Sequence, residues 1–360
     1  MEKVNWWQHG IQHCKGVGPR TLRKWLGVVS IQELFEDKPH SLFAKLGHGS
    51  TLRTWIKERQ HCEVVGESNF KERLGNSTWF QDSDFPWRLN ECPDAPLLLH
   101  YQGEPNWNGP KMCAVVGTRT PDDEGRRLTE QLVAYLGNLD CGIISGMAYG
   151  IDFEAHQVSN KLDVPNFGVL GSGLGKFYPS KHQNEAQRTQ KHGAIISEFL
   201  PYTKPDRENF PQRNRIIAGM ADLCIVVQSK AKGGALITAE LAGDYNREVG
   251  VFPGNIFNEN FHGNNRFIYE SKAFCIHQLD TIAHQMGWKN EGQQLSLHWA
   301  KPEFPDRFLY LEKHLSKEAI SIETLAINCQ KEIHSIKNDL FFLELEGLIQ
   351  LLPGNQVKLV

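Results

Sequence analysis

The chain has 360 residues, which is too long for one ordinary domain and predicts two or three. Hydrophobic residues make up 40% of it, and the formal net charge of -3 excludes a surface that is basic all over, so any nucleic-acid site must be a local patch. No apolar run approaches the roughly 20 residues that span a membrane, the N-terminus lacks a signal-peptide pattern, and the eight cysteines form no CxxC pair. We therefore expect a cytoplasmic protein with reduced thiols and no membrane partner.

Residues 1–75 are predicted to form a helical domain, because Trp, Leu and Ile residues recur there at helix-like intervals. A GVGP turn at 16–19 separates two of these helices, and Arg20, Arg23 and Lys24 follow it. The pattern is similar to a helix-hairpin-helix or SAM-type unit, in which backbone N–H groups of the turn face a phosphate. The alternative is a plain bundle turn that uses glycine for its backbone freedom, and the sequence leaves both open.

Residues 76–287 have the pattern of an α/β domain. A proline-containing connector leads to a strand at 97–100, and short apolar runs then alternate with helical stretches. This alternation predicts an extended, Rossmann-like, doubly wound parallel sheet. The expected strands are 113–116, 141–144, 166–170, 194–197, 223–227, 249–252 and 274–276, and a helix at 280–286 closes the domain.

A polar, proline-containing linker is expected at 288–304, followed by a small module at 305–360. Helices at 309–315, 321–327 and 332–345, and a hairpin of 347–352 with 356–360, predict a winged helix-turn-helix. The third helix carries Lys337, but it also carries Glu332, Asp339 and Glu344. A reader of duplex DNA presents more cations to phosphate, so the pattern favours a protein contact or a weak DNA contact.

The glycine-rich turns do not match the standard nucleotide motifs. The GSGLGKF run at 171–177 has three residues between its glycines where a P-loop has four, and it lacks the Ser or Thr after the lysine. No GxGxxG follows the first parallel strand, and HExxH and a nucleophile elbow are also missing. Asp152, Glu154 and His156 spread over different faces of one helix, and we interpret Asp152 as the cap of that helix. We therefore expect no catalytic residues, no metal and no cofactor.

Small residues, hydroxyls and cations gather where the predicted strands end. The carboxyl ends of parallel strands lie along one edge of a sheet, where ligands bind, and glycines and helix N-termini let backbone N–H groups approach an anion. Lys176 stands beside Phe177 and Tyr178, and a cation next to aromatic faces favours the unstacked bases of a single strand over a duplex. The candidate phosphate and single-stranded DNA contacts are Gly117, Thr118, Arg119, Ser145, Gly146, Gly171, Ser172, Gly173, Lys176, Phe177, Arg213, Asn214, Arg215, Lys232, Gly234 and Thr238.

Two structural alternatives apply to these candidates. Any parallel sheet needs small residues at tight turns, so part of the glycine pattern can be purely structural. Arg213 and Arg215 can form ion pairs within the chain. Cations are unfavourable near a helix N-terminus, so two of them there require an anion, and this requirement favours a phosphate.

The ordered motifs together resemble the DprA/Smf family of DNA-processing proteins. The matching segments are GTR (117–119), SGMAYGIDFEAH (145–156), GSGLGKFYP (171–179), FPQRNRIIAG (210–219), GGALITA (233–239) and PGN (253–255). The resemblance also covers 85–103 and the C-terminal winged helix at 342–354. It implies binding and protection of single-stranded DNA taken up during natural transformation, loading of the RecA recombinase onto it, a homodimer formed through the Rossmann-like domain, and no catalysis. By motif match, Arg119 is the family's phosphate-gripping arginine.

The sequence departs from the family pattern in a few places, notably Thr118 for serine and Tyr149 for a frequent arginine. An enzyme also remains as an alternative. GGALITAE (233–240) loosely echoes the PGGxGTxxE motif of lysine-decarboxylase-like nucleotide phosphoribohydrolases, and Glu240 would be its base. The simpler interpretation of Glu240 is an ordinary solvated or paired acid on a helix.

Overall fold

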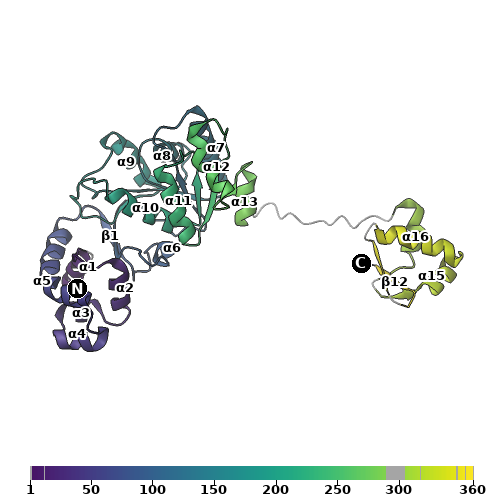
Figure 1. The fold of residues 1–360 in the computed structure, drawn as a ribbon, viewed down its shortest axis with the longest axis horizontal. Coiled ribbons are helices and arrows are strands. Elements are labelled where there is room, and N and C mark those ends of the chain that lie inside the picture. The colour runs from purple at the N-terminus through teal and green to yellow at the C-terminus, as the bar shows by residue number, and fades with distance from the viewer. Residues whose placement is uncertain are drawn as a thin grey trace. The chain divides into compact units, whose positions relative to one another are not determined.

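The computed structural model describes residues 2–11, 13–288, 305–316, 318–345, 348–352 and 354–359. The chain divides into two compact units, one up to residue 289 and one from residue 290, and each is described by itself (Figure 1). Within the described residues, no helix is long and apolar enough to cross a membrane.

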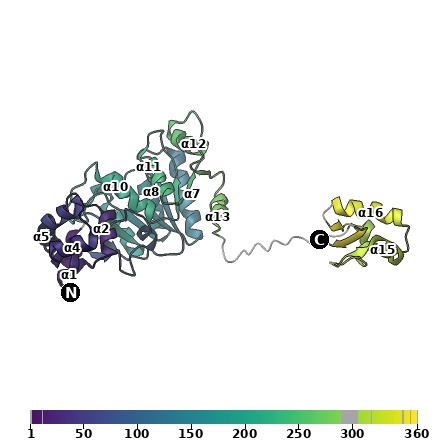
Figure 2. The same cartoon turned by 60° about the horizontal axis from the view of Figure 1, so that its bottom comes forward.

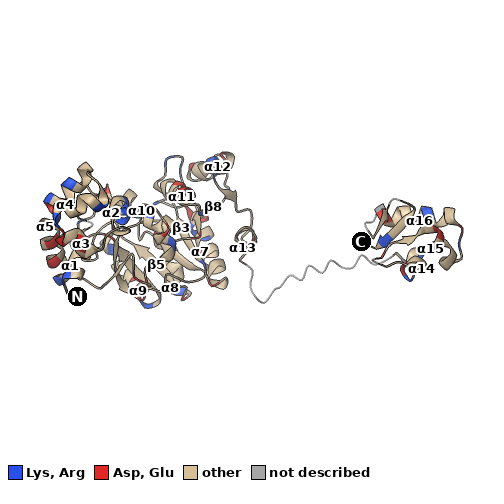
Figure 3. Ribbon diagram, turned by 90° about the horizontal axis from the view of Figure 1, so that it is seen from below, with Lys and Arg blue, Asp and Glu red and all other residues tan. Residues whose placement is uncertain are grey.

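The N-terminal segment is helical, as predicted. Its five helices gather beside the sheet domain, at the end opposite α12 and α13 (Figures 1 and 2). Side chains such as Trp7, Leu22 and Trp55 form a separate hydrophobic cluster there. Figure 3 shows acidic and basic residues interspersed along these helices. They are α1 (Glu2–Ile11), α2 (Pro19–Leu26), α3 (Ile31–Glu36), α4 (Pro39–Leu46) and α5 (Ser50–Lys71).

The GVGP turn uses glycine for its backbone freedom, as the plain-turn interpretation expects. Gly16 has a φ of +79°, a left-handed conformation that favours glycine, and Gly18 is the N-cap of α2, whose first residue is a proline. Arg23 donates hydrogen bonds to the carbonyl oxygens of Ala95 (3.1 Å) and Pro96 (3.0 Å). This arginine therefore docks α2 against the segment before the sheet, and the phosphate contact stays a prediction for the remaining cations of the turn.

The sheet has nine strands in the order β1-β2-β6-β5-β4-β3-β7-β8-β9. All pairs from β6 to β9 in this order are parallel, as predicted, whereas β1 and β2 add an antiparallel edge. The connector expected from the sequence contains β1. The strands are β1 (Asn76–Trp79), β2 (Leu98–Gly103), β3 (Met112–Val116), β4 (Gly142–Ser145), β5 (Asn166–Val169), β6 (Ala194–Ser197), β7 (Leu223–Val226), β8 (Glu248–Val251) and β9 (Phe274–Cys275).

Both faces of the sheet are buried, as a doubly wound fold requires. Along β3, Ala114 and Val116 pack into one hydrophobic cluster, whereas Cys113 and Val115 pack into another on the opposite face. Helices α7 (Asp123–Asn138), α8 (Ile151–Lys161) and α13 (Asp280–Met286) contribute to the second cluster. Helices α10 (Asn209–Gly219), α11 (Gly234–Asp244) and α12 (His262–Tyr269) contribute to the first. Two short helices complete the domain: α6 (Trp87–Asn90) and α9 (Gln183–His192).

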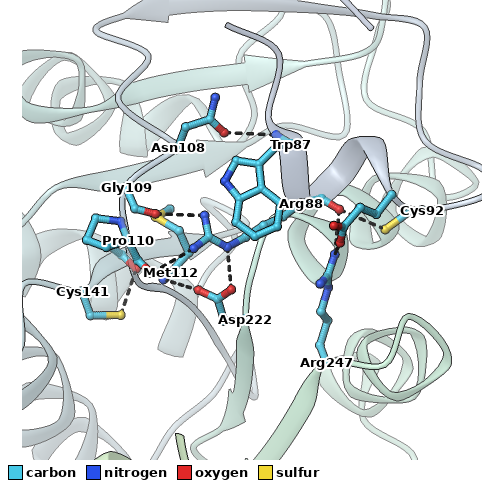
Figure 4. A network of polar contacts seen from close by, with 12 residues as sticks. Trp87, Arg88, Cys92, Asn108, Gly109, Pro110, Met112, Cys141, Asp222 and Arg247 are labelled. Carbon is cyan, nitrogen blue, oxygen red and sulfur yellow. Dashed lines mark hydrogen bonds and ion pairs between the residues drawn. The ribbon is translucent and has the colours of Figure 1, made fainter. Parts of the chain in front are cut away.

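A buried arginine holds the amino-terminal ends of the central strands together. Arg88 of α6 donates from Nε to Asp222 Oδ1 (2.6 Å) and from its two terminal nitrogens to the carbonyl oxygens of Gly109 (3.0 Å) and Pro110 (3.1 Å) (Figure 4). The other oxygen of Asp222 accepts the N–H of Met112 (2.9 Å). The segment before the sheet is thus fixed to the starts of β3 and β7.

The second unit contains the three helices and the terminal hairpin that the sequence predicts. Ser321 accepts a hydrogen bond from the N–H of Thr324 (3.1 Å) and caps α15. The unit has its own core, which includes Leu325, Ile336 and Leu340. Its elements are α14 (Leu309–Glu312), β10 (Ile320–Ser321), α15 (Ile322–Cys329), α16 (Ile333–Leu345), β11 (Ile349–Leu352) and β12 (Gln356–Leu359), with strand order β10-β12-β11.

The predicted linker at 288–304 falls, apart from its first residue, outside the described residues. Trp288 is buried and belongs to the second hydrophobic cluster of the sheet domain. The structure therefore assigns Trp288 to that domain.

Candidate nucleic-acid interface

A pocket of about 760 Å³ opens at the carboxyl ends of β3 and β7. From β3 the chain runs through β4 and β5 to β6 on one side of the sheet, and from β7 it continues to β8 and β9 on the other side. The pocket therefore lies at the topological switch point, the place where open α/β sheets bind ligands. We call it the strand-end pocket. Its lining comprises Val116, Gly117, Thr118, Arg119, Ala148, Asp152, Tyr178, Arg207, Phe210, Pro211, Arg213, Asn214, Ile217, Ser229, Lys230, Lys232, Gly233, Gly234, Ala235, Ile237 and Thr238.

The N-terminus of α11 faces this pocket. Its N-cap is Gly233, no side chain caps its first turn, and that turn contains no acidic residue. A side chain added at Gly234 would meet nothing within 4 Å, so the space in front of the turn is open. Uncapped N–H groups at the positive end of a helix are a natural site for an anion such as phosphate.

Four exposed cations surround the opening: Arg119, Arg207, Lys230 and Lys232. The guanidinium carbon of Arg119 lies 5.5 Å from the ring centroid of Phe210, and this guanidinium makes no hydrogen bond within the described part of the chain. Among the described residues, the Lys230 side chain forms a single contact of this kind, an exposed ion pair with Glu259 at 3.6 Å. Such exposed pairs are worth about 0–1 kcal/mol, so these cations have donors available for a ligand.

Beneath them lie a buried arginine, Arg213, and a buried carboxylate, Asp152, which influence each other electrostatically. Arg213 is 3% exposed, its Nη1 donates to the carbonyl oxygen of Val169 (2.6 Å), and its Nε is buried without a partner. Burial lowers the pKa of Arg213 to about 10, although the nearby carboxylate of Asp152 opposes that effect. Burial raises the pKa of Asp152, and the charges of Arg213 and Arg119 oppose this shift. Asp152 thus compensates the buried cation and acts electrostatically on Arg119 above it.

The expectation that Asp152 caps α8 is wrong. The N-cap is Gly150, and α8 has no side-chain cap. The backbone N–H groups of Gly117 and Gly146, in the turns after β3 and β4, instead act on this carboxylate and oppose the rise in its pKa that burial causes. The carboxylate is turned toward the sheet edge, where it meets these donors and the buried arginine.

Two aromatic rings supply flat surfaces in the pocket. Phe210 belongs to the first turn of α10, and the ring of Tyr178, which is 45% exposed, lies 6.1 Å from it. Tyr178 is one of the two rings that the sequence places beside Lys176, and Phe177, the other one, was the predicted contact. The ring of Phe177 is half-buried and packs with Leu74 against a small hydrophobic cluster, whereas Lys176 is exposed outside the pocket lining.

The structure gathers half of the predicted contact residues in the pocket. These are Gly117, Thr118, Arg119, Arg213, Asn214, Lys232, Gly234 and Thr238. The others serve mainly the packing around it. Ser145 is buried and donates its hydroxyl to the carbonyl oxygen of Val115 (2.6 Å), and Ser172 is buried as well. Gly146 and Gly173 have no room for a side chain, because Arg213 and the backbone of Leu200 lie against them, and a side chain at Gly171 would press on the Phe210 ring.

Arg215 is not brought to the pocket. It forms an ion pair with Glu198 and donates from Nη1 to the carbonyl oxygen of Asp94 (2.6 Å). The anions that the sequence analysis required beside Arg213 and Arg215 are therefore carboxylates of the chain itself, Asp152 and Glu198. The inference that two cations near a helix N-terminus indicate a phosphate was wrong here, because these carboxylates come from other segments of the chain and the local sequence does not reveal them.

Several pocket residues were not among the predicted contacts: Asp152, Tyr178, Arg207, Phe210, Ser229 and Lys230. Arg207 had a detectable signal, since it lies three residues before Phe210 in the segment that leads into α10. Lys230 lies in the loop that follows β7, where a cation near a strand end was to be expected.

Two alternatives to an anion site can be assessed from the geometry. Glu240, the candidate base of the enzyme hypothesis, does not line the pocket; it forms an ion pair with Lys272 at 3.7 Å. This agrees with its interpretation as an ordinary paired acid. Among the described residues, no group of three or more His, Cys, Asp or Glu side chains could hold a metal ion.

Comparison with known proteins now identifies the family. Residues 76–287 match the family described as DNA recombination-mediator protein A. The chain belongs to this family. The matched segment contains the whole nine-stranded sheet and every residue of the strand-end pocket. It also contains the antiparallel strands β1 and β2.

Curated relatives match beyond this segment. Protein Smf of Synechocystis is 35% identical over 285 residues, which cover 75% of this chain and 69% of that protein. Protein Smf of Escherichia coli is 28% identical over 319 residues, covering 85% of this chain and 79% of that protein. The DNA processing protein DprA of Streptococcus pneumoniae is 34% identical over 202 residues, covering 56% and 71% respectively.

Solved structures of the family confirm the fold. The X-ray structure of DprA from Streptococcus pneumoniae superposes with a TM-score of 0.63 at 28% identity, covering 75% of this chain and 98% of that one. A structure of DNA processing protein A from Helicobacter pylori, described for its single-stranded DNA binding mode, superposes with a TM-score of 0.54 at 24% identity and covers 59% and 96%. The doubly wound sheet and its flanking helices are therefore the family fold.

Proposed function

We propose that this chain binds the backbone of single-stranded DNA in the strand-end pocket and acts there without catalysis. One observation carries the proposal: exposed cations with available donors and an uncapped helix N-terminus converge at the switch point of the sheet. Arg119, Arg207 and Lys232 grip phosphate oxygens, and the N–H groups at the start of α11 add a backbone contact.

The aromatic rings favour a single strand. Bases of a single strand are free to stack, and each base–aromatic stack is worth about 1–3 kcal/mol whatever the base. Phe210 and Tyr178 present their rings beside the cations, and Thr118 and Asn214 add polar groups to the same wall. Lys176 is exposed and lies two residues before Tyr178 in the sequence. In this proposal it contacts the DNA strand at the point where the DNA leaves the pocket.

The family supports a role in DNA recombination. We further propose that the chain acts on DNA taken up during natural transformation, protects it and loads the RecA recombinase onto it, as a cytoplasmic homodimer joined through the sheet domain. The relative from Helicobacter pylori is described as binding single-stranded DNA, which supports the ligand.

Binding and loading are tested separately. Fluorescence anisotropy with a labelled oligonucleotide should show binding of single-stranded DNA and weaker binding of the same sequence as a duplex. A loading assay on DNA that is pre-coated with single-strand-binding protein should show faster recombinase filament formation when the chain is added. An absence of binding to single strands would refute the proposal, whereas binding without loading would refute only the recombinase role.

The phosphoribohydrolase alternative has a direct test of its own. The position of Glu240 away from the pocket argues against it. Incubation with nucleoside monophosphates should release no free base. Release that disappears on Glu240→Gln would replace the binding function with an enzymatic one.

A further inference from the structure

A loop after β8 exposes two large apolar side chains to solvent. It runs from residue 253 to residue 260, and within it Ile256 is 70% exposed and Phe257 is 87% exposed. An aromatic ring that stays almost entirely in water does not contribute to stability through burial. The stability of the fold therefore does not explain why an aromatic residue stands at position 257. Neighbouring strand β8 pairs with β7, so this loop begins beside the loop that carries Lys230.

The loop is held firmly, so looseness does not explain the exposure. Asp122 accepts hydrogen bonds from the side-chain amides of Asn258 (3.1 Å), Asn260 (3.2 Å) and Gln228 (2.8 Å). The N–H of Phe257 donates to Asn255 Oδ1 (2.9 Å). At the start of the loop, the N–H of Gly254 donates to Asn265 Oδ1 (3.2 Å). Both ends of the loop are therefore anchored, and the Phe257 ring is presented to solvent from a pre-organised backbone.

The ring adjoins the strand-end pocket. A second hollow of about 630 Å³ is lined by Phe257, and Lys230 is common to both hollows. A DNA strand that has a phosphate at Lys230 can therefore extend along the surface from the strand-end pocket to the second hollow. The rest of this lining consists of Glu124, Asn255, Asn258, Glu259 and Asn260.

The charges of the second hollow indicate which part of a nucleotide it takes. Glu124 and Glu259 repel a phosphate, but carboxylates accept hydrogen bonds from the amino groups of bases. An aromatic face with acceptors beside it suits a base, while the phosphate stays at Lys230.

We propose that the loop at 253–260 is a second nucleotide subsite, in which a base of the strand that fills the strand-end pocket stacks on Phe257. This inference rests on the proposed function. A protein partner is the less favoured occupant. A stable protein interface buries about 1,200–2,000 Å² around an apolar core, whereas here two apolar side chains are bordered by charged ones.

The test measures the affinity of full-length variants for oligonucleotides of two lengths. Phe257→Ala should weaken binding of a strand of about 16 nucleotides by about 5- to 150-fold, the size expected for loss of one base stack. A strand of about 4 nucleotides, which occupies only the strand-end pocket, should bind Phe257→Ala as it binds the unaltered chain. Because the side chain is exposed, the substitution leaves the fold intact, and thermal unfolding checks this.

Two further variants separate stacking from simple hydrophobic contact. Phe257→Trp keeps an aromatic face and should retain the affinity for the longer strand, whereas Phe257→Leu should lose it. Equal affinities of Phe257→Ala and the unaltered chain at both lengths would overturn the subsite while leaving the proposed function standing. Full function of Phe257→Leu, or a change only in self-association measured by sedimentation, would assign the ring to a protein contact and also overturn the subsite. An unaltered chain that binds no single strand would refute both proposals.

Discussion

The two ends of the same sheet use arginine in opposite ways. At the amino-terminal end, Arg88 is 2% exposed and its hydrogen bonds to a carboxylate and two carbonyl oxygens tie three segments together. At the carboxyl-terminal end, Arg119 is exposed, rests over an aromatic ring and has no hydrogen-bond partner among the described residues. An arginine whose donors are already bonded within the chain thus maintains the fold. An arginine whose donors are not bonded there is available to a ligand.

The largest effect on stability is expected from substitution of Arg88, at the amino-terminal end of the sheet. Arg88→Ala leaves Asp222 without its partner, and removal of one member of a buried ion pair costs about 3–5 kcal/mol. Urea unfolding should therefore show a large loss of stability or a chain that does not fold. Arg266→Ala is the matched control, since its pair with Glu270 is exposed and contributes about 0.5 kcal/mol or less. Equal unfolding free energies for the two variants would contradict the structural role of Arg88.

At the other end, the loss should appear in binding. Arg119→Ala removes charge-assisted hydrogen bonds to phosphate, worth about 1.5–3 kcal/mol, so the Kd for single-stranded DNA should rise about 10- to 150-fold. The unfolding free energy should change by no more than about 0.5 kcal/mol, because the side chain is exposed. Arg127→Ala, an exposed arginine of α7 outside the pocket lining, should leave the Kd unchanged. A marked loss of stability in Arg119→Ala would show that Arg119, like Arg88, maintains the fold, and would contradict its role as a ligand contact.

Buried histidines extend the comparison to groups whose charge depends on pH. Burial lowers the pKa of His100 to about 3 and that of His13 to about 4, and the charges of neighbouring histidines act in the same direction. These folded-state pKa values lie below the ordinary histidine value of 6.5, so the unfolded chain binds protons more readily as the pH falls. Stability is fully present above about pH 6.5 and is lost at up to about 1.4 kcal/mol per pH unit for each group below it.

The measurement is urea unfolding between about pH 7 and pH 4, a range that covers the fall from the ordinary histidine pKa toward the folded-state values. His100→Phe should flatten the pH dependence, whereas substitution of His61, which is exposed on α5, should leave it unchanged. An unaltered slope in His100→Phe would show that this histidine does not couple folding to pH.

The smallest effect is expected from the second unit. On α16, the acidic residues are partly engaged within the unit: Asp339 accepts from the hydroxyl of Tyr310, and Glu344 accepts from the N–H of Leu351 (2.9 Å). Lys337 is the cation this helix adds, and a single exposed ionic contact is worth about 0–1 kcal/mol. Deletion of 305–360 should therefore change the Kd for single-stranded DNA by less than about fivefold. Loss of most duplex affinity on deletion would show that α16 reads DNA.

Much of the fold follows from local patterns in the sequence. The parallel strands are short, continuous apolar runs that end in glycines, and their order of alternation with helices predicts the sheet and places Arg119 and Lys232 at one edge. Strand β1 was missed because its four residues, NSTW, form no apolar run. Its place is fixed by pairing with β2, which is a tertiary interaction.

The features of the site that could not be predicted from the sequence also depend on tertiary contacts. Whether a glycine makes room for a ligand or for the chain depends on what lies against it: Gly234 faces open space, whereas Gly146 touches Arg213. Whether an arginine is available depends on its carboxylate partners. Arg215 meets Glu198, and Arg213 meets Asp152, which lies on a different helix. Neither relation has a local signal in the sequence.

The salt dependence of binding tests the role of Arg119 most directly. The logarithm of the affinity for single-stranded DNA should fall linearly with the logarithm of the salt concentration, because bound phosphates release their counterions. Titrations of the unaltered chain and of Arg119→Ala at several salt concentrations should differ in slope by roughly 0.7 for each phosphate that the variant no longer neutralises. A flatter slope together with weaker binding is the predicted result. An unchanged slope and affinity in Arg119→Ala would contradict the assignment of the strand-end pocket as a grip on the DNA backbone.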